Sequence, residues 1–429
     1  MNRKTKTTAT KEEARPALVP RLRFPEFREA EEWENKIIGP YLEDCSERVP
    51  ADTELPIYSS TREGLKRQDA YFDGRVLQNK NEYGVVPPSC LVYRHMSDDG
   101  LFKFNINETG GDIAVSKEYP VFSTKGLNAV FLLAKLNDGL DFKQFALSQK
   151  AGGTRTRLYF SRLCEWRTLL PSLAEQQKIA ECLSSVDELM AAQARKVDAL
   201  KTHKKGLMQQ LFPREGETEP RLRFPEFQNA GVWIREPLGS LCARIMDGTH
   251  FSPKSKEGPS PYLTSKNIKS GRIDLSNLCY ISEEEHNAIH SKCPVKLHDV
   301  LLTKDGANTG NCALNNLDFE FSLLSSVAVL RGDPSKLCQE FLFQSILSDS
   351  VQALITESMS GQAITRITLA KIGGFMIPVT SPAEQHRIAS CLTSLDALIT
   401  AEIQKLEALK THKKGLMQQL FPSPEEATD

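Results

Sequence analysis

The chain has 429 residues, 40% of them apolar, which is enough for two or three domains that each bury a core. Its formal net charge is −1 at pH 7, so any surface for a polyanionic partner must be local and balanced by acidic surface elsewhere. No run of eighteen apolar residues is present, and residues 1–8 lack the apolar core of a signal peptide. The sequence therefore predicts a cytoplasmic protein without a membrane span.

The first landmark along the chain is residues 20–27 (PRLRFPEF), which return unchanged as residues 220–227. A second block, residues 201–213 (KTHKKGLMQQLFP), returns unchanged as residues 410–422. Identical strings of this length indicate an internal duplication, with separations of 200 and 209 residues. Solenoid units repeat about every 20–50 residues, so the period is too long for a solenoid. Two whole domains have been copied.

Between the landmarks lie two globular regions, residues 29–170 and 228–380. Each contains short β-rich runs with turn residues between them and helical patterns near its end, so each is predicted to be a mixed α/β domain. The two regions differ almost throughout, which favours two different ligands of one kind. The clearest predicted strands are residues 89–94, 112–115, 299–303 and 326–330, and the clearest predicted helices are residues 131–147 and 341–355.

A long helix is predicted after each globular region. Ser172 with Glu175, and Ser381 with Glu384, match the capping box, in which Ser and Glu satisfy unpaired amides at a helix start. Apolar residues then recur at steps of four and three, the a/d spacing of a coiled coil, over about five heptads. A helix of about 36 residues is about 55 Å long, the length of a spacer. The seam residues are Ile179, Leu183, Val186, Met190, Val197, Leu200, Leu207 and Leu211, and in the copy Ile388, Leu392, Leu395, Ile399, Leu406, Leu409, Leu416 and Leu420.

The two seams match each other, so we expect the helices to pair. Polar residues interrupt both seams at equivalent places, Gln193 with Glu402 and Lys204 with Lys413, and such residues commonly fix register. A pseudo-two-fold axis between the copies would make the pair antiparallel. The alternative is that each apolar stripe packs only on its own globular region.

A few residues near the end of the globular regions are retained at an offset of 209. Arg157 matches Arg366, a glycine precedes each of them (Gly152 and Gly361), and Leu163 and Ile372 follow. Residues that read two different ligands should differ, so retained residues favour a role in the fold or in a contact that is independent of sequence.

Taken together, these motifs resemble the specificity subunits of type I restriction-modification enzymes. The resemblance rests on the two divergent regions, on the pattern P-x-x-x-E-Q-x-x-I-A from Pro171 and its E-Q-x-x-I-A counterpart from Glu384, and on the KKGLMQQLF ends of both helices. The second region is similar to one common kind of target-recognition domain and the first looks like another kind. The segments that carry this similarity are residues 247–250 (DGTH), 263–268 (LTSKNI) and 299–306 (DVLLTKDG), and residues 58–60 (YSS), 64–66 (GLK) and 83–86 (YGVV).

The resemblance implies a non-catalytic subunit that reads a bipartite target on double-stranded DNA. It would assemble with two adenine-methyltransferase subunits and two restriction/translocase subunits, and S-adenosylmethionine, ATP and magnesium would belong to those partners. The expected fold is α/β (α+β), with two target-recognition domains separated by an antiparallel coiled coil that acts as a ruler. The expected parts are a tail (1–20), domain 1 (21–170), a spacer helix (171–213), a linker (214–220), domain 2 (221–380), a second spacer helix (381–422) and a tail (423–429).

Candidate DNA contacts are loop residues whose side chains can bind base edges or phosphates. Plain solvated surface remains the alternative for each one, and Arg157 and Arg366 could equally pair with a carboxylate inside the fold. The candidates are Ser60, Arg62, Lys66, Arg67, Arg94, His95, Arg155 and Arg157 in the first domain, and His250, Lys254, Lys266, Asn267, Lys304, Gln362 and Arg366 in the second.

The repeated KKGLMQQLF block is a candidate docking surface for the methyltransferase subunits, through Lys204, Lys205, Lys413 and Lys414. Cations near a helix C-terminus also favour the helix dipole, which is the structural explanation.

Three other interpretations have less support in the sequence. His286 and His290 lie four residues apart, a spacing that can ligate zinc, but no third ligand is evident and a surface helix is the preferred interpretation, so no metal site is predicted. An enzyme that modifies DNA itself lacks support, since neither an N/D-P-P-Y motif nor a G-x-G-x-x-G loop after a strand is present. A coiled-coil adaptor that binds proteins fits the helices but not the full family pattern.

Overall fold

The computed structural model divides the chain into two compact units, each described here by itself. The first unit comprises residues 1–193 and 405–429, and the second comprises residues 194–404. Each unit therefore holds one globular region, the first half of the long helix that follows it and the second half of the other long helix. The residues that the structure describes are 19–71, 82–150, 155–359 and 366–422.

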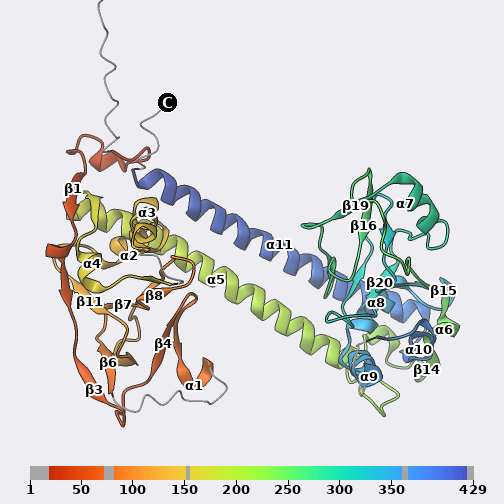
Figure 1. Ribbon diagram of the computed structural model, residues 1–429. Coiled ribbons are helices and arrows are strands. Elements are labelled where there is room, and N and C mark those ends of the chain that lie inside the picture. Colours follow the sequence, from red (N-terminus) through yellow and green to blue (C-terminus); the bar gives the residue numbers. More distant parts are fainter. Residues whose placement is uncertain (1–18, 72–81, 151–154, 360–365, 423–429) are drawn as a thin grey trace, which may run out of the picture. The chain divides into compact units, whose positions relative to one another are not determined.

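The sheets of the first unit are antiparallel throughout their registered pairs (Figure 1). Their strands are β1 (Glu34–Ile37), β2 (Leu42–Asp44), β3 (Arg48–Pro50), β4 (Tyr58–Thr61), β5 (Gly64–Arg67), β6 (Glu82–Val86), β7 (Leu91–Tyr93), β8 (Met96–Ser97), β9 (Phe104–Ile106), β10 (Ile113–Ser116), β11 (Val121–Thr124), β12 (Thr156–Arg157) and β13 (Arg167–Leu170). A four-stranded sheet has the order β2-β11-β7-β9 and a three-stranded sheet the order β10-β6-β3, while β1-β13, β4-β5 and β8-β12 form pairs.

The helices of the first globular region cover an aromatic core. The single helix predicted over residues 131–147 is two helices in the structure, because Gly139 adopts an extended backbone with ψ 133°. A Cβ at Gly139 would lie 2.4 Å from the carbonyl oxygen of Lys135, so glycine is the residue that fits there. The short helices of this region are α1 (Gln68–Tyr71), α2 (Ala129–Asp138), α3 (Leu140–Ser148) and α4 (Phe160–Cys164).

The second globular region repeats part of this plan. Its strands are β14 (Ile234–Pro237), β15 (Cys242–Asp247), β16 (Ser260–Leu263), β17 (Ile268–Lys269), β18 (Arg272–Ile273), β19 (Cys279–Ile281), β20 (Val300–Thr303), β21 (Cys312–Leu314), β22 (Ser322–Leu323), β23 (Val327–Gly332) and β24 (Met376–Val379). The sheet β15-β23-β20-β21 corresponds to β2-β11-β7-β9, and the pair β14-β24 corresponds to β1-β13. A sheet of order β19-β16-β22, in which β16 and β22 run parallel, has no counterpart in the first unit as described.

The helix predicted over residues 341–355 is also divided, at Ser348, whose backbone is extended and whose hydroxyl donates to the Ser345 carbonyl. Both globular regions thus place two short helices where the sequence predicts one. The helices of this region are α6 (Leu238–Leu241), α7 (Glu283–His290), α8 (Gln339–Leu347), α9 (Asp349–Met359) and α10 (Leu369–Gly373).

The long helices are α5 (Leu173–Leu211) and α11 (Pro382–Leu420), each of 39 residues. Every predicted seam residue is buried or half-buried, which confirms the a/d pattern. The remaining faces are mostly polar and charged, but Leu189, Leu398 and Ile403 are exposed on them. Among the described residues no helix is long and apolar enough to cross a membrane.

The starts of both helices follow the capping box only in part. The Glu175 amide donates to the Ser172 hydroxyl over 3.3 Å, as predicted. The Glu175 carboxylate, however, receives two hydrogen bonds of 2.8 Å from the buried guanidinium of Arg23, in the PRLRFPEF segment. Arg223 and Glu384 form the same bidentate pair in the second unit. The repeated segment therefore fastens each helix start to its own globular region.

Within each unit the two helix halves run antiparallel and are joined by equivalent ion pairs. In the first unit, Lys413 Nζ on α11 lies 2.7 Å from Asp187 on α5. In the second, Lys204 on α5 lies 2.7 Å from Asp396 on α11. The polar seam residues thus pair across the helices, as a register-fixing role requires.

The end of each long helix packs into the globular region of the unit that holds it. Phe421 contacts the rings of Trp33 and Phe131 at centroid distances of 6.1 and 5.4 Å. Phe212 contacts Trp233 and Phe341 at 6.1 and 5.4 Å. The helix that follows the second globular region, α11, therefore completes the core of the first region. In the same way α5, which follows the first region, completes the core of the second.

Candidate nucleic-acid interface

The two globular regions share a backbone frame at the place where the sequence predicts the candidate contacts. Ser89 and His298 are 209 residues apart, and they are the described non-glycine residues with a positive φ, at 64° and 67°. Each leads directly into a buried strand, β7 or β20. Two regions with little sequence identity thus turn in the same way at the same position.

The same offset continues in the hydrogen bonds that follow these strands. Leu158 donates its amide to the His95 carbonyl over 2.8 Å, and Ile367 donates to the Lys304 carbonyl over 2.8 Å. Arg157 stands opposite Met96 on the β12-β8 pair, while Arg366 forms a bridge with Asp305. The retained arginines therefore occupy equivalent places in the two units.

A cleft of about 680 Å³ opens beside this frame in the first unit. Ser60, Arg62 and Arg94 line it, and so does Lys103, which the sequence analysis did not select. Arg62 donates to both oxygens of Asp99 at 2.6–2.7 Å, and this contact, together with the Ser97 hydroxyl, holds the pKa of Asp99 below its usual range. The cleft is therefore lined by Arg62, whose charge is paired with Asp99, and by two further cations, Arg94 and Lys103.

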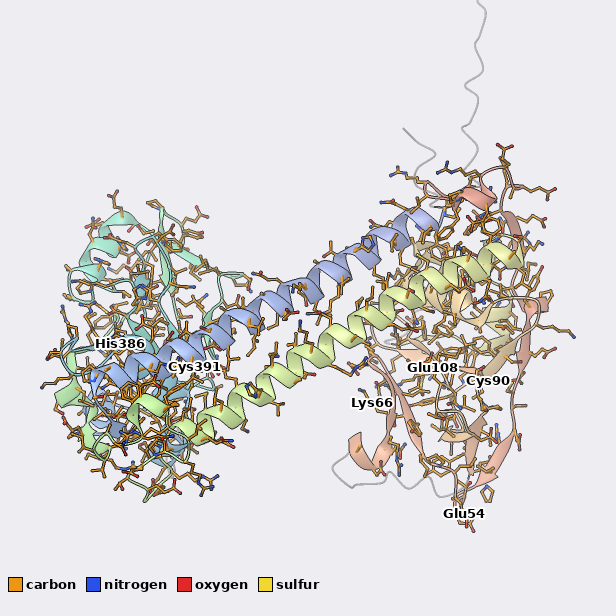
Figure 2. All side chains as sticks on the ribbon, turned by 180° about the vertical axis from the view of Figure 1, so that it is seen from behind. Glu54, Lys66, Cys90, Glu108, His386 and Cys391 are labelled. Carbon is orange, nitrogen blue, oxygen red and sulfur yellow. The ribbon has the colours of Figure 1, made fainter. Side chains whose placement is uncertain are left out.

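Two arginines of this region have the positions expected for DNA contacts. Arg94 and Arg157 are exposed, and neither forms an ion pair or side-chain hydrogen bond with another described residue. Lys66, on β5, is likewise exposed (Figure 2). Arg67 pairs with Asp69 at 2.8 Å and Arg155 with Asp98 at 2.8 Å, both at the surface, where a phosphate could replace the carboxylate.

Two candidates of the first domain have structural partners. His95 is 8% exposed, its Nδ1 lies 2.7 Å from the Glu118 carbonyl and its ring stacks on Tyr159. Ser60 is 9% exposed and accepts a hydrogen bond of 2.8 Å from Asn105. These contacts assign both side chains to the fold.

In the second unit four candidates lie at the surface. His250, Lys254 and Lys266 are exposed, and His250 Nε2 lies 3.5 Å from Asp247. Arg366 has half of its side chain exposed and lies 3.9 Å from Asp305, a distance too long for a hydrogen bond.

Lys304 and Asn267 have positions that argue against DNA contact. Lys304 is 2% exposed and its ammonium lies 3.2 Å from Asp247. Asn267 is 5% exposed; its side-chain oxygen accepts from the Thr264 amide and its nitrogen donates to the Asp274 carbonyl. Both side chains are used inside the domain. Gln362 lies outside the described residues.

The lysines of the repeated block fall into two classes. Lys204 and Lys413 form the interhelical ion pairs, with 11% and 24% of their side chains exposed. Lys205 and Lys414 are exposed, and their side chains form no hydrogen bond or ion pair with the described part of the chain. Only the second class offers a free cation to a partner.

Comparisons with known proteins agree with this architecture. Residues 98–202 and 238–411 match the family described as type I restriction modification DNA specificity domain. The putative type I restriction enzyme MjaX specificity subunit of Methanocaldococcus jannaschii is 25% identical over an aligned length of 354 residues, and the match covers 77% of this chain and 79% of the relative. The MjaVIII specificity subunit of the same organism is 24% identical over 263 residues, 59% of this chain and 60% of the relative.

Solved structures show the same fold. The crystal structure of the type I restriction-modification S subunit from M. genitalium has a TM-score of 0.58 at 14% identity, covering 94% of this chain and 99% of that chain. A chain from a structure that describes complex assembly and conformational transition of the type I R-M system has a TM-score of 0.53 at 17% identity, covering 91% and 98%.

The fold and the matched residues define a protein with two target-recognition domains, and the chain belongs to the type I restriction modification DNA specificity family. It is the DNA specificity subunit of a type I restriction-modification system, a kind of subunit that is non-catalytic and acts within the type I complex.

Proposed function

We propose that each globular domain contacts one half of a split target on double-stranded DNA. The proposal rests on one observation: the two domains share the same backbone path at this place but carry different side chains on it. At the residue after β7 the first domain exposes Arg94, whereas the second domain has the fully buried Thr303 at the equivalent place. Domains that read different bases should differ at the reading positions and agree at the phosphate contacts.

The proposed contacts are the candidate residues whose side chains are exposed. Arg94 reads a base edge, since an arginine makes bidentate hydrogen bonds to guanine. Arg157 and Arg366, retained and equivalent, bind backbone phosphates. His95, Ser60, Asn267 and Lys304 are left out because their side chains are engaged in the fold. The remaining proposed contacts are Arg62, Lys66, Arg67 and Arg155 in the first domain and His250, Lys254 and Lys266 in the second.

Substituting these two arginines should have different effects. Arg94→Ala is expected to relax the first half of the target, with a loss of about 1–3 kcal/mol of discrimination at one base pair. Arg157→Ala should weaken binding to all sequences and lower the salt slope by about one. The measurements are a methylation map of host DNA with the chain and its methyltransferase subunit, and DNA affinity at several salt concentrations.

Arg28→Ala is the matched control, because Arg28 is an exposed arginine of the first unit that does not line the cleft. It should leave both readouts unchanged. An unaltered methylation motif and unaltered affinity in Arg94→Ala and Arg157→Ala would contradict the proposed interface.

The methyltransferase subunits dock, in this proposal, on the exposed face of the repeated block. Two equal partners need two equivalent surfaces, and Lys205 and Lys414 provide the same free cation at both places. The double variant Lys205→Glu/Lys414→Glu should lower the affinity for the methyltransferase subunit by about tenfold or more, as loss of a charged interface contact does. Sedimentation of the purified complex at low and high salt measures this.

Lys204 and Lys413 are unsuitable for that test, since their reversal would break the ion pairs to Asp396 and Asp187. Lys150→Glu, an exposed lysine outside the block, is the charge control. Unchanged stoichiometry and affinity in the double variant would overturn the docking surface.

The remaining assignments concern the partners. Two restriction/translocase subunits complete the complex in the cytoplasm, and S-adenosylmethionine, ATP and magnesium are bound by the partner subunits. The paired helices, each about 58 Å long at 1.5 Å per residue, set the separation of the two half-sites.

A further inference from the structure

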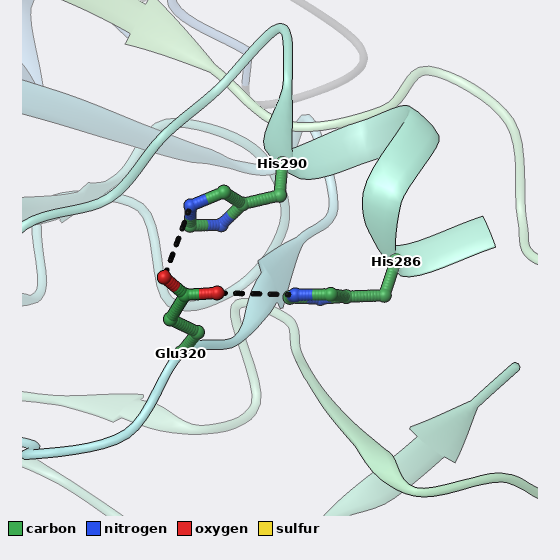
Figure 3. A group of neighbouring side chains, drawn as sticks. All are labelled: His286, His290 and Glu320. Carbon is green, nitrogen blue, oxygen red and sulfur yellow. Dashed lines mark ion pairs between the residues drawn. The ribbon is translucent and has the colours of Figure 1, made fainter. Parts of the chain in front are cut away.

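Three side chains outside the proposed DNA contacts converge in the second unit. His286 and His290 lie one turn apart on α7, and Glu320 lies in the segment that precedes β22 (Figure 3). The Nε2 atoms of the two histidines lie 3.7 and 3.9 Å from the two carboxylate oxygens of Glu320. The three ligand atoms lie within 4.8 Å of one another.

The fold orients the first histidine toward this point. The Nδ1 atom of His286 lies 2.9 Å from the Ser322 hydroxyl, and 9% of the side chain is exposed. A hydrogen bond at one ring nitrogen leaves the other nitrogen for a metal ion and fixes the direction of its lone pair.

The second histidine has no such structural explanation. Its Nδ1 atom is buried without a hydrogen-bond partner among the described residues, and its Nε2 faces Glu320. A buried ring nitrogen without a hydrogen bond is costly, although 21% of the His290 side chain is exposed. Glu320, by contrast, has 74% of its side chain exposed, so it can move toward the histidines.

The distances leave room for a cation. Separations of 3.7 and 3.9 Å exceed hydrogen-bond length, and neutral imidazole lone pairs and a carboxylate are all acceptors. Zinc binds histidine nitrogen at about 2.0–2.1 Å and carboxylate oxygen at about 2.0–2.2 Å, which puts neighbouring tetrahedral ligands about 3.3–3.5 Å apart. The three ligand atoms lie within 4.8 Å of one another, so the widest pair needs to close by at most about 1.5 Å.

We propose that His286, His290 and Glu320 form a binding site for a divalent transition-metal ion, of which zinc fits the donors best. The fourth coordination position faces solvent on the side of Glu320. The ion would tie α7 to the strand β22, whose Ser322 orients His286. Because Glu285, on the same helix, accepts hydrogen bonds from the amides of Lys254 and Ser255, the site would also support that loop.

The test is metal binding by the full chain, prepared without a polyhistidine tag and stripped with a chelator. Zinc is titrated by calorimetry, and cobalt(II) reports tetrahedral coordination by its visible absorption. We expect a wild-type site of one equivalent that Glu320→Gln weakens by at least about tenfold. Zinc should also raise the melting temperature of the wild type more than that of Glu320→Gln.

Asp318→Asn is the matched control, because it removes an exposed carboxylate two residues from Glu320 that forms no hydrogen bond or ion pair with the described residues. It should bind zinc as the wild type does. His290→Gln should weaken zinc binding at least as much as Glu320→Gln does. Equal zinc affinity in wild type and Glu320→Gln, or no zinc binding by the wild type, would overturn the proposal. Because Glu320 is exposed, weaker zinc binding by Glu320→Gln would not be explained by misfolding of the variant.

Discussion

Inserting one heptad into each long helix at equivalent positions, after Arg195 in α5 and after Gln404 in α11, is expected to abolish methylation of the native target. Seven residues add about 10 Å to a helix, which corresponds to about three base-pair steps along DNA. A heptad keeps the apolar seam continuous, so the helices should still pair. Methylation mapping should show at least a hundredfold loss at the native motif, and any new motif should keep both half-sequences with a longer gap.

Replacing residues 196–202 by another heptad of the same pattern controls for changed helix composition without changed length. This variant should methylate the native motif. Full methylation of the native motif by the insertion variant would show that the helices do not set the distance between the half-sites.

The second large effect is expected for Phe421→Ala. Phe421 is 8% exposed and packs against Trp33 and Phe131, and loss of a buried phenylalanine costs about 3–5 kcal/mol. The substitution lies after the last helix, yet the loss should fall on the first unit. Hydrogen exchange should therefore accelerate in the peptides around Phe131 and remain slow in those around Phe341.

Phe212→Ala should give the opposite pattern, because Phe212 packs against Trp233 and Phe341. Gln418→Ala, at an exposed position in the last turn of α11, should change neither unit. If Phe421→Ala loosened the second unit instead, this would refute the exchange of helix ends, by which the end of each long helix packs into the globular region of the other copy.

The long helices could be predicted from the periodicity of apolar residues, because the a/d pattern marks the residues that are buried along one face of a helix. The antiparallel pairing followed from the duplication. The start of each helix was only half predicted, since the sequence shows Ser172 and Glu175 close together but not Arg23, which lies 152 residues away from its partner Glu175. Contacts at such separations depend on the tertiary fold.

The same limit explains why some of the candidate residues are buried in the fold. Lys304 follows a strand and precedes a glycine-containing turn, so its sequence context resembles that of an exposed loop lysine. In the fold its side chain turns inward to Asp247, 57 positions earlier in the chain, and is buried. Glu320 was missed as a neighbour of His286 and His290 for the converse reason, because nothing local to it suggests a ligand. Arg94 and Arg157 were selected from residue type alone; the structure shows that both are exposed, and their contact with DNA stays a prediction.

The exchange of helix ends has a consequence for a protein with only one copy of the repeat. Such a chain would supply a globular region and a helix whose terminal phenylalanine has no pocket of its own to fill. Two identical chains could satisfy each other, each lending its terminal helix turns to its mate, and would form a symmetric dimer that reads a palindrome. Joining two different copies in one polypeptide, as here, would permit the two halves of the proposed split target to diverge.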